Sequence, residues 1–151
     1  MTIGYKKCLA YNYKEILKKE TILGTVRNKD LFVLVELEIS DDAKTFTPHE
    51  AKSRTEYAKV VKIHGGGSVA YSLFDNSFEY KVGETVNPDR FDEDSNKECS
   101  SGIHFFYNKD MAIRYFSNSW LYIMDNNIGQ YVMITGTDTI VDDKRITSKR
   151  K

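Results

Sequence analysis

Long hydrophobic runs are absent from this 151-residue sequence. No run approaches the ~18 apolar residues that a membrane-spanning helix needs, so we expect no membrane span. The N-terminal residues MTIGYKKCLAYNYKE also lack the apolar core of a secretory signal peptide. The sequence therefore predicts a soluble protein that stays in the cytoplasm.

Cysteine is scarce and net charge is absent. The two cysteines, Cys8 and Cys99, exclude a disulfide-dense secreted scaffold. The 22 basic residues balance the 22 acidic ones, so the formal net charge is +0, which argues against general nucleic-acid binding. Since a domain holds roughly 100–200 residues, residues 1–151 are expected to form a single domain.

The spacings that metal sites require are missing as well. The candidate ligands are Cys8, Cys99, His49, His64 and His104. No two cysteines form a CxxC pair, and no two histidines stand four apart on a predicted helix. The acidic loop at 89–94 lacks the glycine and the later glutamate of a calcium loop. We therefore predict no metal site.

Motifs for nucleophilic catalysis and for phosphate binding are also incomplete. Cys99 stands beside Glu98 and an acidic loop, which disfavours a reactive thiolate. No GxSxG elbow surrounds the serines before Gly102, and GGGS at 65–68 lacks the lysine of a P-loop. The sequence assigns no catalytic residue and no cofactor, and it favours a protein that is not an enzyme.

Aromatic residues are abundant by contrast, with ten Tyr, eight Phe and one Trp. Tyr and Phe, like Val and Ile, fit the pleated, half-buried surface of a sheet. The strongest strand pattern, LFVLVELEI at 31–39, alternates Leu31, Val33, Val35, Leu37 and Ile39 on one face. The predicted fold is a β-dominated α+β fold with compact, mostly antiparallel sheets and one or two short helices.

Turn and cap residues predict how these elements connect. The glycines at 65–67 predict a hairpin between strands at 56–64 and 68–74, and 41–54 has the composition of a loop. Asn108 is a candidate N-cap for a helix at 109–116. The other expected segments are a helix or turn at 12–20 and strands at 4–11, 78–82, 103–107, 119–124, 130–136 and 139–141. The basic tail at 144–151 is either a solvated terminus or in contact with an anionic ligand or nucleic acid.

One stretch resembles a known family. FEYKVGETVNPDRFDEDSNKECSSGIHFF at 78–106 resembles the signature of an uncharacterised domain of large DNA viruses and phages, which often follows pentapeptide repeats. The matching pieces are YKVG at 80–83, PDRFDED at 88–94, ECSSGIHFF at 98–106 and Tyr115. Upstream, VELEISDDAK at 35–44, KSRTEYAKVVKI at 52–63 and AYSLFD at 70–75 are similar to the same family. The resemblance thus covers most of residues 31–116.

The resemblance implies a biological setting for the protein but no catalytic activity. The chain departs from the family pattern at Ser40, where the family has Pro, and at Ser53, where it has Cys. The family carries no assigned activity. What it implies is a viral or phage accessory protein that acts in the cytoplasm of a host cell.

A weaker resemblance concerns GIHFF at 102–106, which is similar to the GIYFA block of ADP-ribosyltransferase-like folds that use NAD. Those folds carry an Arg or His on a first strand, where this chain has Lys6 or Lys7. They also keep a catalytic Glu on a C-terminal strand, where this chain has Met133 and Thr135. The resemblance implies a related architecture whose pocket lacks its key acid.

Three functions stay open at this point. The favoured one is a small non-catalytic binding module that sequesters a nucleotide-like anionic ligand of host defence, through aromatic and charge-assisted contacts. The others are an ADP-ribosyltransferase-like enzyme and an adaptor that binds a host protein. The sequence also leaves a homo-oligomer open. The candidate ligand-binding residues are Tyr5, Lys6, Tyr80, Lys81, His104, Phe106 and Tyr115.

Overall fold

Strands dominate the computed structural model, which describes residues 1–20, 25–47, 52–96, 100–125 and 128–136. The strands in these ranges are β1 (Thr2–Leu9), β2 (Thr25–Arg27), β3 (Phe32–Ile39), β4 (Thr45–Phe46), β5 (Ser53–Thr55), β6 (Ala58–His64), β7 (Val69–Tyr71), β8 (Glu79–Lys81), β9 (Thr85–Val86), β10 (Ile103–Phe105), β11 (Ser119–Asp125) and β12 (Ile128–Thr135). The helices are α1 (Tyr13–Glu20), α2 (Asn28–Leu31) and α3 (Lys109–Arg114), all of them short.

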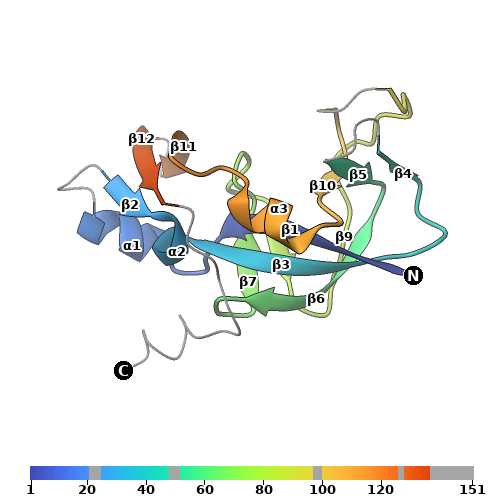
Figure 1. Cartoon of the computed structure of the whole chain (residues 1–151), viewed down its shortest axis with the longest axis horizontal. Helices are drawn as coiled ribbons and strands as arrows, with labels where there is room; N and C mark the ends of the chain where they lie inside the picture. Colours follow the sequence, from blue (N-terminus) through green and yellow to red (C-terminus); the bar gives the residue numbers. More distant parts are fainter. Residues whose placement is uncertain (21–24, 48–51, 97–99, 126–127, 137–151) are drawn as a thin grey trace.

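The described strands form three sheets (Figure 1). Six strands form the largest sheet, in the order β8-β7-β1-β3-β6-β9. The two smaller sheets are β10-β5-β4 and β11-β12-β2. The pairing of β12 with β2 is parallel, and the other pairings between the described strands are antiparallel. The β-dominated, mostly antiparallel α+β fold predicted from the sequence is confirmed.

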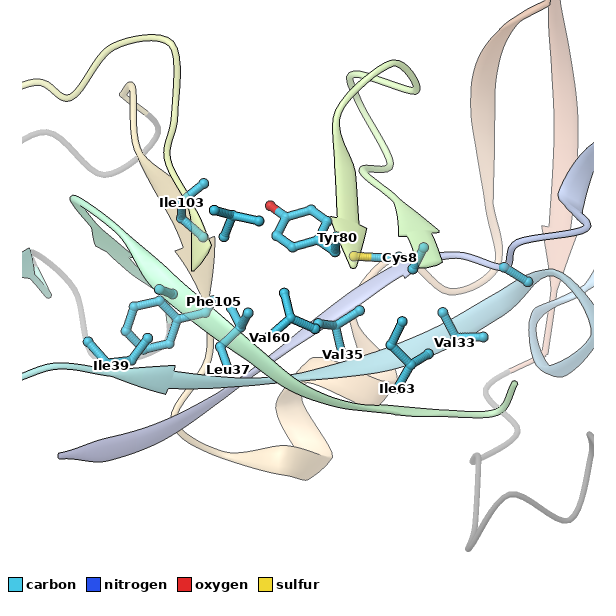
Figure 2. Close-up of a cluster of buried hydrophobic side chains, with 14 of the residues drawn as sticks. Cys8, Val33, Val35, Leu37, Ile39, Val60, Ile63, Tyr80, Ile103 and Phe105 are labelled. Carbon is cyan, nitrogen blue, oxygen red and sulfur yellow. The ribbon is translucent and has the colours of Figure 1, made fainter. Parts of the chain in front are cut away.

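Strand β3 lies at the centre and is apolar on both faces. Val33 and Val35 face the largest hydrophobic cluster, where Cys8, Tyr80 and Phe105 pack with them (Figure 2). The opposite face of β3 packs against α3, which crosses over β1 and β3 (Figure 1). A central strand that is covered on two sides can tolerate the nearly continuous apolar run seen at 32–35. The predicted alternation is therefore confirmed, although Leu31 ends α2 rather than starting the strand.

The third sheet covers a separate cluster at one end of the molecule. Leu121, Ile123, Val132 and Ile134 of the β11–β12 hairpin face inward, toward buried residues of α1 and β2. Helix α1 is amphipathic, with Ile16 and Leu17 buried and its lysines exposed. The two strands predicted at 119–124 and 130–136 are thus confirmed.

The hairpin predicted across the three glycines is wrong. Strand β6 pairs with β3 and β9, whereas β7 pairs with β8 and β1. Gly65, Gly66 and Gly67 all have positive φ, at 109°, 133° and 78°, which lets the chain leave the β3–β6 edge instead of folding straight back. The hairpin forms one connection later, between β7 and β8.

Two further predictions need correction. The 41–54 segment is not all loop, because β4 and the first residues of β5 lie in it. The helix after Asn108 ends at Arg114 and not at residue 116, since Phe116 has a φ of 56°. Asn108 does cap this helix, where its side-chain oxygen accepts from the backbone N–H of Met111 at 3.0 Å. Pro48, His49, Cys99, the strand at 139–141 and the tail at 144–151 lie outside the described residues.

Candidate ligand-binding cleft

Two adjoining cavities lie along the edge of β1 that is opposite β3, where no strand pairs with β1 continuously. On this edge β1 pairs with β7 only at Leu9, and the backbone of Tyr5 pairs with Phe106 through hydrogen bonds of 2.7 and 2.8 Å. The stretch of β1 at Lys6 and Lys7 lies between these two contacts. Since backbone groups of an antiparallel strand alternate in direction, the N–H of Lys7 points to the same edge as that of Tyr5. The gap therefore presents a backbone donor as well as side chains.

The larger of these spaces has a volume of about 440 Å³ and is here named the lysine cavity. Three lysines line it: Lys6 and Lys7 from β1, and Lys52 from the residue before β5. The adjoining space, of about 320 Å³, is here named the loop cavity because residues 88–90 and 101–102 wall it. Lys6 and His104 line both, so the two cavities form one cleft with Lys6 at the junction.

Lys6 is a partly buried cation held by neutral groups. Its Nζ donates to the backbone carbonyl of His104 at 2.9 Å and lies 5.8 Å from the ring centroid of Tyr80. Burial lowers the pKa of the Lys6 ammonium, and the charge of Lys52 lowers it further. Among the described residues, no carboxylate forms an ion pair with Lys6.

The other two lysines are also held by uncharged partners. Lys7 is 3% exposed, and its Nζ donates to Asn28 Oδ1 at 3.1 Å and lies over the ring of Phe32. Burial lowers the pKa of Lys7 to about 8. Lys52 Nζ donates to the Tyr115 hydroxyl at 3.3 Å and lies 5.0 Å from the centroid of that ring. Three lysines thus line one cavity whose described lining holds a single carboxylate, that of Asp75.

The carboxylate of Asp75 already serves the turn that it begins. Its Oδ1 accepts from the backbone N–H and the hydroxyl of Ser77, at 3.2 and 2.6 Å. The residue is exposed at the rim, where it lines both cavities. The interior of the cleft is therefore basic and one edge of it is acidic.

Aromatic rings supply most of the remaining lining. Phe106 and Tyr115, whose centroids lie 5.4 Å apart, face the lysine cavity together with Phe74 and Phe105. Phe78 and Tyr80, whose centroids lie 5.3 Å apart, face the loop cavity. Burial raises the pKa of the Tyr80 phenol well above its ordinary value, so this group stays neutral. Rings beside amines suit a ligand with a planar part and an anionic part.

The loop cavity depends on a buried arginine that sequence reasoning missed. Arg54 has no exposed surface, and its guanidinium donates to the backbone carbonyls of Asp92, Asp94 and Ser101. It also lies 5.1 Å from the Phe46 ring centroid and 5.3 Å from that of Phe91. The sequence signal was the arginine in KSRTEYAKV near the acidic loop, but the sequence could not show that this side chain is buried and donates to main-chain carbonyls of that loop.

The structure brings five of the seven predicted ligand residues together. Lys6, Tyr80, His104, Phe106 and Tyr115 line the cleft. Tyr5 packs against the cluster of Phe106 and α3 and is not part of the lining. Lys81 is exposed and pairs with Glu79 at 3.2 Å, which raises its pKa. Lys7 and Lys52 are lining residues that sequence reasoning left out of the predicted site.

The structure also places the residues on which the other hypotheses from the sequence depend. Met133, which stands where transferase-like folds keep a glutamate, pairs with Trp120 and Thr25 on β12 and does not line the cleft. Among the described residues, no three His, Cys, Asp or Glu side chains gather in a way that could hold a metal ion. Burial raises the pKa of the Cys8 thiol to about 12, which removes it as a nucleophile. No helix in the described ranges is long and apolar enough to span a bilayer.

Comparisons with known proteins place the chain among viral relatives. The profile of a family of unknown function, DUF5758, matches residues 1–112. An uncharacterised protein of Acanthamoeba polyphaga mimivirus, L223, is 35% identical over 125 residues, which cover 74% of this chain and 78% of that protein. No solved structure matches. The matched residues include both β1 and β10, which form the walls of the cleft.

Proposed function

The chain belongs to the DUF5758 family, and we propose that it is a non-catalytic module that binds a small anionic ligand with a planar ring, of the nucleotide class, in its lysine cavity. Since a mimivirus protein is a relative of this chain, the role that we propose for such a module is to sequester a nucleotide signal of host defence in the cytoplasm of the infected cell. A phage setting and an attachment to pentapeptide repeats stay predictions of the sequence.

The observation that carries the proposal is a set of three lysines, Lys6, Lys7 and Lys52, for which the described part of the chain shows no carboxylate partner. Removing a lysine charge from water costs free energy unless a counter-charge or hydrogen bonds replace the lost hydration. Lys6 and Lys7 line the cavity, and the described partners of their ammonium groups are a carbonyl, an amide oxygen and aromatic rings. A phosphate in the cavity would supply the missing negative charge to both lysines and to Lys52.

The cavity also fits the rest of such a ligand. Its volume of about 440 Å³ lies in the range of small-molecule sites, which are mostly apolar with a few convergent polar groups. The rings of Phe106 and Tyr115 offer a wall for a nucleobase, and the N–H of Lys7 offers a backbone donor for a phosphate oxygen.

Isothermal titration with AMP, cyclic AMP, GMP and UMP tests the proposal. We expect saturable binding of at least one of them by the wild-type protein, and a loss of at least tenfold in affinity for Lys6→Met. The matched control is Lys81→Met, which removes an exposed lysine outside the cleft and should leave the affinity unchanged. The bound ligand should also raise the melting temperature, because it binds the native state alone.

The absence of heat and of thermal shift with all four nucleotides would overturn the proposal. Equal losses in Lys6→Met and Lys81→Met would also contradict it, since they would indicate attraction by the overall surface charge and not by the cavity. The circular dichroism spectrum of both variants should match that of the wild-type protein.

A specific observation also favours the adaptor hypothesis as a second candidate. The outer face of the β11–β12 hairpin exposes Trp120 by 56%, Tyr122 by 45% and Tyr131 by 68%. Tyr122 and Tyr131 pair across the two strands, with ring centroids 5.0 Å apart. Exposed aromatic residues of this kind are enriched in protein interfaces. A host protein that wild type and Lys6→Met capture equally, and Tyr131→Ser does not, would support this candidate.

A further inference from the structure

We propose that the cleft binds a two-armed ligand, a phosphodiester with a planar ring on each side, and that the loop cavity is the subsite for its second arm. This inference rests on the proposed function, because the first arm and the phosphate occupy the lysine cavity. The chemical class is therefore a dinucleotide rather than a mononucleotide.

The two cavities repeat one arrangement on either side of Lys6. The pair Phe106 and Tyr115 lines the lysine cavity, and the pair Phe78 and Tyr80 lines the loop cavity. Lys6 lines both and lies over the ring of Tyr80. An anionic linker at Lys6 would thus carry one ring toward each aromatic pair. A mononucleotide would fill only one of the two cavities.

The lining of the loop cavity differs from that of its neighbour in a way that suits a second nucleoside. Ser101 and Arg90 line this cavity alone, and Ser72 lines both cavities. Hydroxyls and a guanidinium can satisfy the polar edges of a base or the hydroxyls of a ribose. The carboxylates of Asp75 and Asp89 also line it, so this subsite favours the neutral, donor-rich part of a ligand over a second phosphate.

Hydrogen bonds within the protein hold the wall of the loop cavity in place without a ligand. Arg54 donates to the main-chain carbonyls of Asp92 and Ser101 at 2.6 and 3.0 Å, and the N–H of Asp92 donates to the carbonyl of Ser101 at 3.1 Å. These bonds join the two ends of the acidic loop, where residues 89–90 and 101–102 face the cavity. Arg54 is therefore a positioning residue for this subsite, and a fixed wall avoids the entropic cost of ordering a loop on binding.

The test compares AMP with the linear dinucleotide pApA by isothermal titration at equal ionic strength. We expect pApA to bind the wild-type protein at least tenfold more tightly than AMP does. In Ser101→Phe, which places a ring in the loop cavity, the affinity for pApA should fall to that for AMP, while the affinity for AMP should stay unchanged. In Arg90→Ala, an exposed position that is safe for folding, the affinity for pApA should fall at least threefold and that for AMP should not.

Each outcome supports or overturns the inference. Equal affinities of AMP and pApA for the wild-type protein would overturn the second subsite and leave the proposed function standing. A tenfold preference for pApA that survives in both variants would also overturn it, because the second arm would then lie elsewhere. Binding of neither compound would overturn the proposed function itself.

Discussion

The Lys6 ammonium donates to the backbone carbonyl of His104 at 2.9 Å, which joins the first strand to β10 across 98 positions of the sequence. This bond holds the amine at the junction of two cavities, beside the Tyr80 ring. The carbonyl is a neutral acceptor, so it orients the charge without cancelling it. The contact that joins β1 to β10 thus leaves a cation at the cleft.

Replacing Lys7 with methionine should stabilise the protein at neutral pH. The pKa of Lys7 is lowered from 10.5 to about 8, which corresponds to roughly 3 kcal/mol of cost for the charged form. The lost hydrogen bond to Asn28 offsets about 1 kcal/mol of the gain. Urea unfolding at pH 7 should therefore show Lys7→Met to be more stable by about 1–2 kcal/mol.

The pH dependence of this effect has a definite sign. Below pH 8 the lysine is charged in both the native and unfolded states, so the cost is fully present. As the pH rises from about 8 to 10.5 the native state loses its proton first, and the stability of the wild-type protein rises relative to Lys7→Met. For the control Lys59→Met, at an exposed position on β6, the difference in stability from the wild-type protein should stay constant over this pH range. A constant difference from pH 7 to 10.5 would contradict the account.

Replacing Asp75 with asparagine should tighten the binding of AMP by about three- to tenfold, because it removes the carboxylate that lines both cavities. Asparagine keeps the side-chain oxygen that accepts from Ser77, so the turn should persist. Titrations at two salt concentrations should show the gain shrinking with salt. The exposed Asp41→Asn is the matched control, and an equal gain there would indicate a general charge effect.

Replacing Arg54 with methionine should cost at least about 3 kcal/mol of the free energy of unfolding, since three buried carbonyls lose a charged donor. The same substitution at Arg27, whose side chain is 63% exposed, should cost less than about 1 kcal/mol. Denaturant melts of the two variants give the comparison. Similar costs at the two positions would show that Arg54 does not organise the acidic loop.

Adding a methyl group at Gly4 should disrupt the junction between β1 and β10. A Cβ there would lie 2.4 Å from Cδ2 of the Phe105 ring, which is itself fully buried. We expect Gly4→Ala to destabilise the protein by about 1–3 kcal/mol, as overpacked cores generally do. The double variant Gly4→Ala, Phe105→Leu should recover part of the loss, and no recovery would place the cost elsewhere.

The sequence predicted those features that depend on local pattern. The alternation in LFVLVELEI identified the central strand, and Asn108 identified the start of α3. The hairpin at the three glycines was wrong because strand pairing depends on which distant edges compete for β6, and β3 and β9 take both of them. Tyr80, His104 and Tyr115 were placed in the site through residue type and family resemblance, and the structure brings them to one cleft.

The missed residues had no local signal. Nothing in the sequence distinguishes Lys7 and Lys52 from the other lysines, and only the folded chain brings them to the cavity beside β1. The role of Arg54 was unpredictable for a related reason, since it donates to main-chain carbonyls 38 to 47 positions away. Lys81 was predicted as a ligand residue but points to Glu79, because a one-residue shift along a strand reverses the face.

The most direct test is an NMR titration of protein labelled with ¹³C at the lysine Cε atoms, with AMP as the added ligand. The account predicts saturable shifts for the signals of Lys6, Lys7 and Lys52 with one common dissociation constant, and none for the exposed Lys81. These signals are assigned from the four single Lys→Met variants. Unchanged signals of Lys6, Lys7 and Lys52 at a saturating concentration of AMP, or shifts confined to exposed lysines, would contradict the claim that this cavity binds an anionic nucleotide.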